Sequence, residues 1–326
     1  YTLLLLLIYM AFISLGLPDS LLGSAWPIMH EAFSVPLSYA GLVTMIISAG
    51  TICSSLMSER LTKKFGTQIV TVCSVLLTAA ALFGFSMSSA FYMLCLWAIP
   101  YGLGAGAIDA ALNNYVALHY SSKHMSWLHC FWGVGTIISP YIMSYALTTS
   151  SWQNGYRMVS FLQMGITMIL FVTLPVWKVN KTAEQQEEQH EVIGIRGAVK
   201  IKGVPQLLLG FFSYCALEST LILWSSSYLV GAKGISAERA AAYAALFCSG
   251  ITLGRFLAGF VTSTASLPLY ASSTSMPNVS KRVRAISIFS ALSSTTRTLF
   301  PVKSLDRSGV FSCSRLFSTG FNCSVK

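Results

Sequence analysis

Long apolar runs separated by short polar breaks dominate this chain from its start to about residue 261. A helix needs about 20 apolar residues to cross a hydrocarbon core about 30 Å thick. The runs are long enough for this, so the pattern predicts membrane-spanning helices rather than the elements of a soluble core. The eight predicted spans cover roughly residues 2–28, 37–57, 68–88, 91–117, 126–148, 156–177, 204–230 and 238–261.

Composition supports a lipid environment. The chain has 326 residues, of which 54% are hydrophobic and only 10% charged, and its mean hydropathy is +0.64. Soluble domains usually carry about a quarter charged residues. We therefore predict an all-α fold, a polytopic membrane protein in contact with the lipid bilayer.

The formal charge of +10 does not indicate nucleic-acid binding. Residues 262–326 hold eight Lys or Arg and one acid, which gives +7, and the remaining +3 lies mostly in short loops between apolar runs. Of the eight cysteines, six lie within apolar runs, where Cys commonly acts as a small hydrophobe. Neither a metal site nor a nucleic-acid partner is predicted.

The loops predict orientation through their Lys and Arg residues. Nine such residues fall on one side and three on the other, which places the first side and the N-terminus in the cytoplasm. The first apolar run continues into Pro18 and Asp19 rather than a cleavage site, so it is not expected to be a signal peptide. Because the chain starts at Tyr1 without Met, we expect a trimmed or incomplete N-terminus.

The order of spans predicts two unequal units. Residues 1–177 form a six-helix bundle, residues 178–203 a cytoplasmic linker rich in Glu and Gln, and residues 204–261 the first two helices of a second bundle. A short internal repeat supports this division. Leu17-Pro18-Asp19-Ser20 resembles Leu217-Glu218-Ser219, with the acidic residue and the serine at an offset of 199, and Ser48-Ala49-Gly50 resembles Cys248-Ser249-Gly250 at an offset of 200. Such parallel repeats are typical of transporters.

Residues 262–326 interrupt the pattern. They contain 23 Ser or Thr and a single acid, and lack the four spans that a complete repeat requires. Three explanations remain open: a natural disordered tail, a genuine eight-helix protein, or a coding sequence that has left its reading frame. We favour the third, because disordered tails are usually rich in Glu, Lys, Gln and Pro. Absence of four hydrophobic segments in the other frames after codon 262 would contradict it.

Three carboxylates, those of Asp19, Asp109 and Glu218, fall mid-span. An ionisable group at bilayer depth costs about 2.5 to 3.5 kcal/mol on insertion scales, so each is a candidate functional group. Burial favours the protonated form of a carboxylate, so each could carry a proton.

Asp19 follows Pro18, which has no N–H and leaves the carbonyl of Ser14 without its helical partner. A broken helix is therefore expected here, with Gly16, Asp19 and Gly23 on one face. Broken helices at the membrane midplane are where transporters expose polar backbone to solute. The alternative is a kinked helix whose Asp19 is tied to a neighbouring helix.

Asp109 lies on a stripe with Gly102, Gly106 and Asn113 at spacings of four, three and four. Glycines permit close helix approach, so Asp109 and Asn113 are expected to face the bundle interior. They form either part of a site or a hydrogen bond that only joins helices. Glu218 is a stronger candidate because the internal repeat places it at the position that corresponds to Asp19.

His129 lies on a stripe that also contains Gly133, and it either shuttles protons and contacts solute or is a satisfied interface residue. Arg255 is expected either to pair with a buried carboxylate or to snorkel. Several tryptophans are candidates for stacking on a sugar face, although membrane anchoring is their commoner role. These are Trp26, Trp97, Trp132 and Trp224.

Charge concentrates in the loop predicted after the second span, at Glu59, Arg60, Lys63 and Lys64, followed by Gly66. Such charges can pair with or cap neighbouring helix ends and so bias which side of a transporter is open. Simple topology explains the lysines but not the Glu–Arg pair with its closing glycine.

This loop resembles the acidic-Arg, basic, Gly signature between helices two and three of the major facilitator superfamily. Residues 16–23, 104–114 and 254–259 further resemble the fucose-permease-like branch of bacterial permeases. In that branch, carboxylates in helices one and four serve solute binding and proton coupling. The resemblance, over about residues 1–261, implies those roles for Asp19 and Asp109.

These observations predict a monomeric secondary transporter of the plasma membrane. Its substrate would be a small polar solute such as a sugar, moved together with protons by alternating access and without any other cofactor. Two other functions remain open: proton-linked efflux of an amphipathic compound, and a receptor-like protein without transport. An enzyme is not expected, since no Ser-His dyad or metal set stands at helical spacing.

Overall fold

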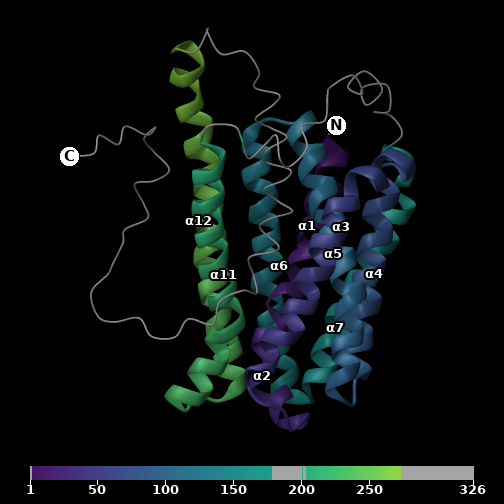
Figure 1. Cartoon of the computed structure of the whole chain (residues 1–326), viewed down its shortest axis with the longest axis vertical. Helices are drawn as coiled ribbons and strands as arrows, with labels where there is room; N and C mark the ends of the chain where they lie inside the picture. Colours follow the sequence, from purple (N-terminus) through teal and green to yellow (C-terminus); the bar gives the residue numbers. More distant parts are fainter. Residues whose placement is uncertain (1, 178–199, 201–202, 273–326) are drawn as a thin grey trace, which may run out of the picture.

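The computed structural model describes residues 2–177, 200 and 203–272. Throughout these residues the secondary structure is helical, without strands (Figure 1). The predicted linker therefore lies almost entirely outside the described residues, as does the chain after residue 272. The helices are α1 Thr2–Asp19, α2 Leu21–Ala32, α3 Tyr39–Phe65, α4 Thr67–Met87, α5 Phe91–His119, α6 Ser122–Thr149, α7 Trp152–Val172, α8 Leu174–Trp177, α11 Val204–Lys233 and α12 Ala237–Ser272.

Eight spans of the described chain are long and apolar enough to cross a membrane, with α1 and α2 counted together. Their outer surfaces carry exposed apolar side chains, such as Leu96 at 62% and Phe161 at 60% exposure, which suits contact with lipid. The predicted fold class, an all-helical polytopic membrane protein, is confirmed. At its C-terminal end α12 continues to Ser272, past the boundary at residue 261 that apolar content predicts, because a helix once formed gains one bond for each residue added.

The break expected in the first span is present and small. Ser20 alone separates α1 from α2, and the helical path resumes where the Ser24 N–H donates to the Ser20 carbonyl. The side chain of Gln163, fully buried on α7, donates from Nε2 to the carbonyl of Ser14. That carbonyl is the one that Pro18 deprives of its helical donor, so Gln163 replaces the missing bond and stabilises the break.

The charged segment expected to be a loop is helical. α3 runs to Phe65, so Glu59, Lys63 and Lys64 lie in its last turns, and the turn to α4 is made at Gly66 with φ of +84°. Glu59 and Lys63 form an exposed ion pair of 3.0 Å one helical turn apart. Lysines near a helix C-terminus also interact favourably with the helix macrodipole. The helix therefore continues through this charged segment. Arg60 is exposed to solvent.

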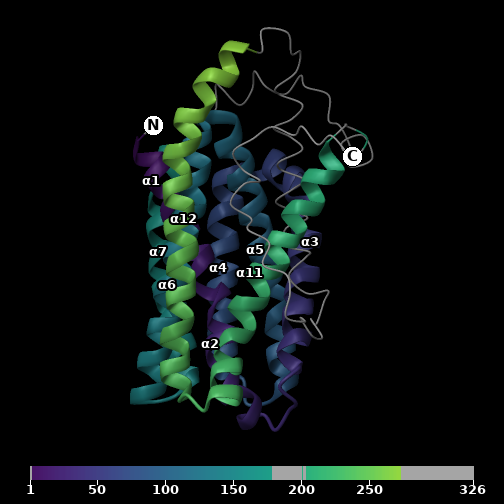
Figure 2. The same cartoon turned by 90° about the vertical axis from the view of Figure 1, so that its left-hand side faces the viewer.

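Helices α1 to α7 form one group, and α11 and α12 lie along one side of it (Figures 1 and 2). α12 packs along α6, and α11 contacts α2. The contact between α2 and α11 depends on Gly23, where an added Cβ would lie 2.2 Å from the Ile222 carbonyl oxygen. The backbones of the two groups therefore touch at this point.

Gly23→Ala is expected to lower the thermal midpoint of the purified protein. The added methyl meets backbone rather than a flexible side chain, and overpacking of this kind costs about 1 to 3 kcal/mol. Gly210→Ala on α11 is the matched control, because nothing lies within 4 Å of a Cβ at that position. Equal midpoints for the two variants, measured by intrinsic fluorescence in detergent, would contradict the close contact.

Candidate functional site

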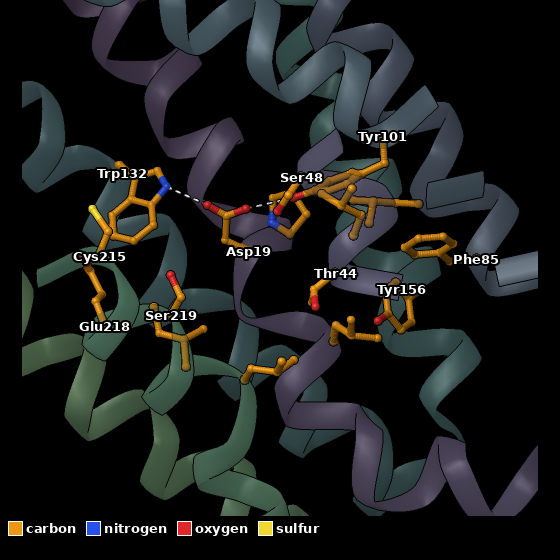
Figure 3. Close-up of a pocket in the computed structure, with 16 residues that line it drawn as sticks. Asp19, Thr44, Ser48, Phe85, Tyr101, Trp132, Tyr156, Cys215, Glu218 and Ser219 are labelled. Atoms are coloured by element: carbon orange, nitrogen blue, oxygen red, sulfur yellow. Dashed lines mark hydrogen bonds between the residues drawn. The ribbon is translucent and has the colours of Figure 1, made fainter. Parts of the chain in front are cut away.

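A cavity lies at the centre of the bundle, between α1–α7 and α11 (Figure 3). The centre of a water molecule could occupy about 90 Å³ of this cavity. Both apolar and polar side chains line it, and they come from both groups of helices. A concave site with a few convergent polar groups is the usual form of a small-molecule site.

The carboxylate of Asp19 lies on one wall of this cavity, at the break between α1 and α2. Tyr101 on α5 donates from its hydroxyl to Oδ1 at 2.9 Å. Trp132 on α6 donates from Nε1 to Oδ2 at 2.8 Å. Hydrogen bonds to an ionised acceptor are stronger than neutral ones, so these two donors fix the carboxylate between three helices.

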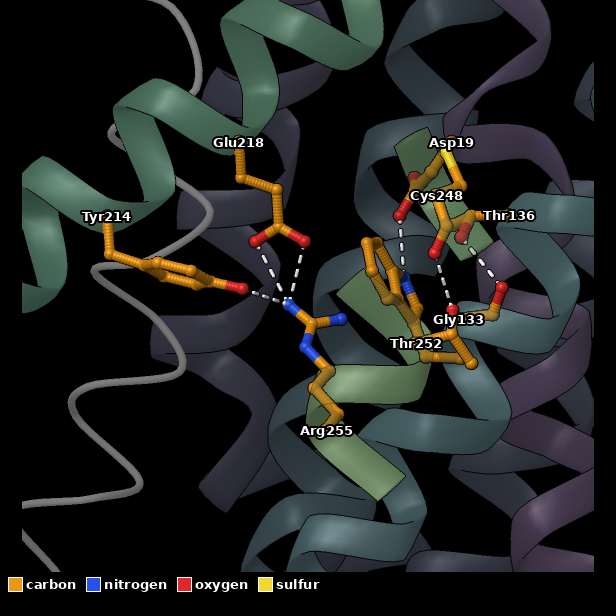
Figure 4. A network of polar contacts seen from close by, with 9 residues as sticks. Asp19, Gly133, Thr136, Tyr214, Glu218, Cys248, Thr252 and Arg255 are labelled. Atoms are coloured by element: carbon orange, nitrogen blue, oxygen red, sulfur yellow. Dashed lines mark hydrogen bonds and ion pairs between the residues drawn. The ribbon is translucent and has the colours of Figure 1, made fainter. Parts of the chain in front are cut away.

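Glu218 on α11 lies across the cavity from this wall (Figure 3). Its two carboxylate oxygens accept hydrogen bonds from Nη2 of Arg255 on α12, at 2.7 and 2.9 Å. The same Nη2 donates to the Tyr214 hydroxyl at 2.9 Å (Figure 4). The carboxylate is therefore compensated by a cation, as a charge at bilayer depth requires.

Arg255 also connects the two walls. Its guanidinium lies 4.6 Å from the ring centroid of Trp132, at the distance of a cation–π contact. Trp132 in turn donates to Asp19. A continuous set of contacts thus runs from Glu218 on α11 through Arg255 and Trp132 to Asp19 on α1.

Aromatic side chains form the remaining wall. Phe85 on α4 stands edge-on to Tyr156 on α7, with centroids 5.6 Å apart at 87°, and lies 6.3 Å from the ring of Tyr101. Thr44 and Ser48 on α3 add hydroxyl groups nearby. The site therefore combines carboxylates, hydroxyls and aromatic faces.

The sequence pattern that defines the Major Facilitator Superfamily matches residues 8–254. The chain belongs to this superfamily. The superfamily expected from the charged motif is thus confirmed, whereas the fucose-permease-like branch stays a prediction.

Individual relatives are distant. The chain is similar to Bypass of stop codon protein 6 of Saccharomyces cerevisiae, with 25% identity over 77% of this chain and 55% of that protein. It is also similar to the Glucose/mannose transporter GlcP of Bacillus subtilis, with 21% identity over 78% of this chain and 65% of that protein. The chain thus spans less than two thirds of the length of either relative.

Solved structures share the fold. The crystal structure of a D-xylose-proton symporter aligns with 90% of this chain and 80% of its own, with a TM-score of 0.63 and 11% identity. At this identity the likeness supports the superfamily fold alone.

The structure places two candidate residues on α5, Asp109 and Asn113, away from the cavity. Asn113 donates from Nδ2 to Asp109 Oδ1 at 2.9 Å within α5. Asp109 lies eight residues along the helix from Tyr101, which is about 12 Å at 1.5 Å per residue, and it is not among the described lining residues. Its predicted coupling role therefore requires action at a distance from Asp19.

His129 does not line the described cavity either. Its ring packs edge-on against Phe12 of α1, with centroids 5.8 Å apart. This geometry places His129 at the interface between α1 and α6.

Trp26 and Trp224 are also absent from the described lining. Trp26 is fully buried, its Nε1 donates to the Leu37 carbonyl at 2.7 Å, and Phe91 packs against its ring edge-on. Its faces are enclosed by protein, because α2 carries it beyond the cavity toward the turn before α3. The described cavity therefore does not include Trp26, whose stacking on a solute stays a prediction, and among the four tryptophans considered, Trp132 is the one that reaches the described cavity.

Sequence reasoning named Trp132 and Arg255 but missed three other residues at or near the site, Tyr101, Gln163 and Tyr156. Tyr101 lies directly before Gly102, at the head of the Asp109 stripe, and that neighbourhood was a usable signal. Gln163 is a polar residue in the middle of an apolar span. Because burying an amide without a partner is costly, its position was a signal that it forms a hydrogen bond there. Tyr156 offers no comparable signal, because it lies at the predicted edge of its span.

Proposed function

We propose that the protein is a secondary active transporter that moves a small, neutral, polyhydroxylated solute of the monosaccharide class together with protons. It works as a multi-pass protein of the plasma membrane with a cytoplasmic N-terminus. The observation that carries the proposal is the central cavity, in which Asp19 and Glu218 lie on opposite walls. Glu218 occupies the position of the predicted second repeat that corresponds to Asp19. Solute sites of repeat-built transporters lie near the midplane at the interface between repeats.

The charges of the cavity disfavour an anionic solute. Its described lining contains two carboxylates, Asp19 and Glu218, and no Lys, Arg or His side chain. An anionic solute would meet like charge, which costs binding energy. A sugar matches both kinds of wall, because its hydroxyls can donate to carboxylates while its C–H faces pack on rings such as Phe85. The likeness to a glucose/mannose transporter supports the same class.

Equilibrium binding tests this proposal. The purified full chain is incubated with radiolabelled D-glucose, D-mannose, D-xylose or succinate in a scintillation proximity assay. Saturable binding of at least one sugar and none of succinate is expected. Binding of succinate without any sugar would overturn the solute class.

Asp109 carries the second part of the proposal, as the residue that takes the coupling proton. Asp109→Asn is expected to abolish proton-driven uptake in proteoliposomes while sugar binding and sugar exchange survive. The carboxamide keeps the size and the contact with Asn113 but cannot release a proton.

Asn113→Ala is the matched control, because it removes the 2.9 Å hydrogen bond but leaves the carboxylate. Uptake by this control should remain gradient-driven. Equal loss of uptake and exchange in Asp109→Asn would remove the coupling assignment.

A further inference from the structure

Tyr156 carries a buried hydroxyl that the protein leaves unpaired. Its side chain is 1% exposed and lines the central cavity. Among the described lining residues it is the one whose polar atom is both buried and without a hydrogen-bond partner. Figure 3 shows the hydroxyl directed into the cavity, on the side where Thr44 lies.

The ring of Tyr156 is held in place from two sides. Phe85 lies edge-on at 5.6 Å and 87°, and Trp152 lies edge-on at 6.1 Å and 89°. A tyrosine so clamped cannot turn its hydroxyl toward another partner without losing these contacts. The hydroxyl therefore has a fixed position, which is what a preorganised binding group needs.

An unpaired buried hydroxyl is costly and needs an explanation. Burying one without a partner costs about 1 to 3 kcal/mol, and native proteins seldom retain such groups. A packing role would be filled equally well by Phe, which has the same ring and no hydroxyl. A ligand that supplies the missing partner accounts for both the hydroxyl and its direction.

We propose that Tyr156 is a specificity-determining residue whose hydroxyl forms a hydrogen bond with one hydroxyl of the transported solute. The inference rests on the proposed function and deepens it. The Asp19 carboxylate and the Tyr156 hydroxyl lie on different walls of the cavity (Figure 3), so the solute must present polar groups on two sides. Phe85 supplies an apolar face next to Tyr156 for the ring carbons. A cyclic polyol fits this arrangement.

The substitution Tyr156→Phe separates the two roles of the side chain. It keeps both edge contacts and removes only the unpaired hydroxyl. The thermal midpoint of the unliganded variant is therefore expected to equal or exceed that of the parent, while solute affinity falls about tenfold. Tyr141→Phe is the matched control, because Tyr141 is 47% exposed and outside the described lining.

The decisive experiment compares deoxy analogues of whichever of D-glucose, D-mannose and D-xylose binds the parent protein. Dissociation constants are measured for each monodeoxy analogue with the parent and with Tyr156→Phe. One analogue should bind both proteins equally, because it lacks the hydroxyl that Tyr156 recognises. The remaining analogues and the intact sugar should favour the parent by about tenfold.

The outcomes separate this inference from the proposed function. No binding of any sugar by the parent would overturn the proposed function, and this inference with it. Sugar binding that is equal in the parent and Tyr156→Phe would overturn the inference alone. A lower thermal midpoint for the unliganded variant would also overturn it, because the hydroxyl would then have a partner within the protein.

Discussion

Asp19→Asn is expected to weaken sugar binding by about 10- to 100-fold. Asn has nearly the shape of Asp but no charge, and hydrogen bonds to a charged group contribute about 1.5 to 3 kcal/mol against about 1 kcal/mol for neutral ones. Trp132 Nε1 can only donate, so the amide oxygen must face Trp132 and the amide nitrogen must face Tyr101. The site then loses the negative charge of Asp19, and the two donors meet an amide in place of a carboxylate.

The binding assay with radiolabelled sugar measures this effect, with Glu31→Gln as the matched control. Glu31 is an exposed carboxylate at the end of α2, so its neutralisation should leave affinity unchanged. The thermal midpoint of Asp19→Asn should stay close to that of the parent. Parental affinity in Asp19→Asn would show that the solute does not use this carboxylate.

Glu218→Gln should be the more damaging substitution for folding. It leaves the guanidinium of Arg255 without its carboxylate partner, although the Arg255 side chain is only 20% exposed. Removing one partner of a buried pair costs about 3 to 5 kcal/mol, because the other charge stays uncompensated. We expect a lower yield of monodisperse protein and a thermal midpoint well below that of the parent.

The double substitution Glu218→Gln with Arg255→Met tests the cause. It removes both charges while keeping the approximate volume, so thermal stability should recover toward the parent value. Solute binding should not recover, because the cavity still lacks the Glu218 carboxylate. A double variant as unstable as Glu218→Gln alone would show that the ion pair is not the source of the loss.

Arg255→Lys refines this result. Lysine keeps the charge for Glu218 but lacks the planar group that lies 4.6 Å from the Trp132 ring. Its stability should therefore fall between that of the parent and that of Glu218→Gln.

The spans were predictable because membrane thickness sets the minimum length of a spanning helix, and each apolar run in the sequence is at least about that long. The break near Asp19 was predictable as well, since proline always removes a backbone donor. The end of α3 was not. Glu59 and Lys63 look like loop residues in composition, yet they pair along one helix face and extend the helix to Phe65.

The site was predictable only where a residue is costly by itself. Asp19 and Glu218 stand out as carboxylates at bilayer depth, whatever their neighbours. Arg255 was one candidate partner from the sequence, and it pairs with Glu218. The places of Tyr101 and Trp132 become evident only after folding, because both are common residue types that two other helices bring to Asp19. For the same reason, helical spacing alone could not show that Asp109 lies outside the described cavity.

Proton-driven accumulation tests the central claim most directly. The full chain is reconstituted into liposomes, an inside-alkaline pH gradient is imposed, and the internal concentration of the labelled sugar that binds is followed over time. The proposed symport predicts that the internal concentration rises above the external one and collapses when a protonophore is added. An internal concentration that never exceeds the external one, or that is unaffected by the protonophore, would contradict it.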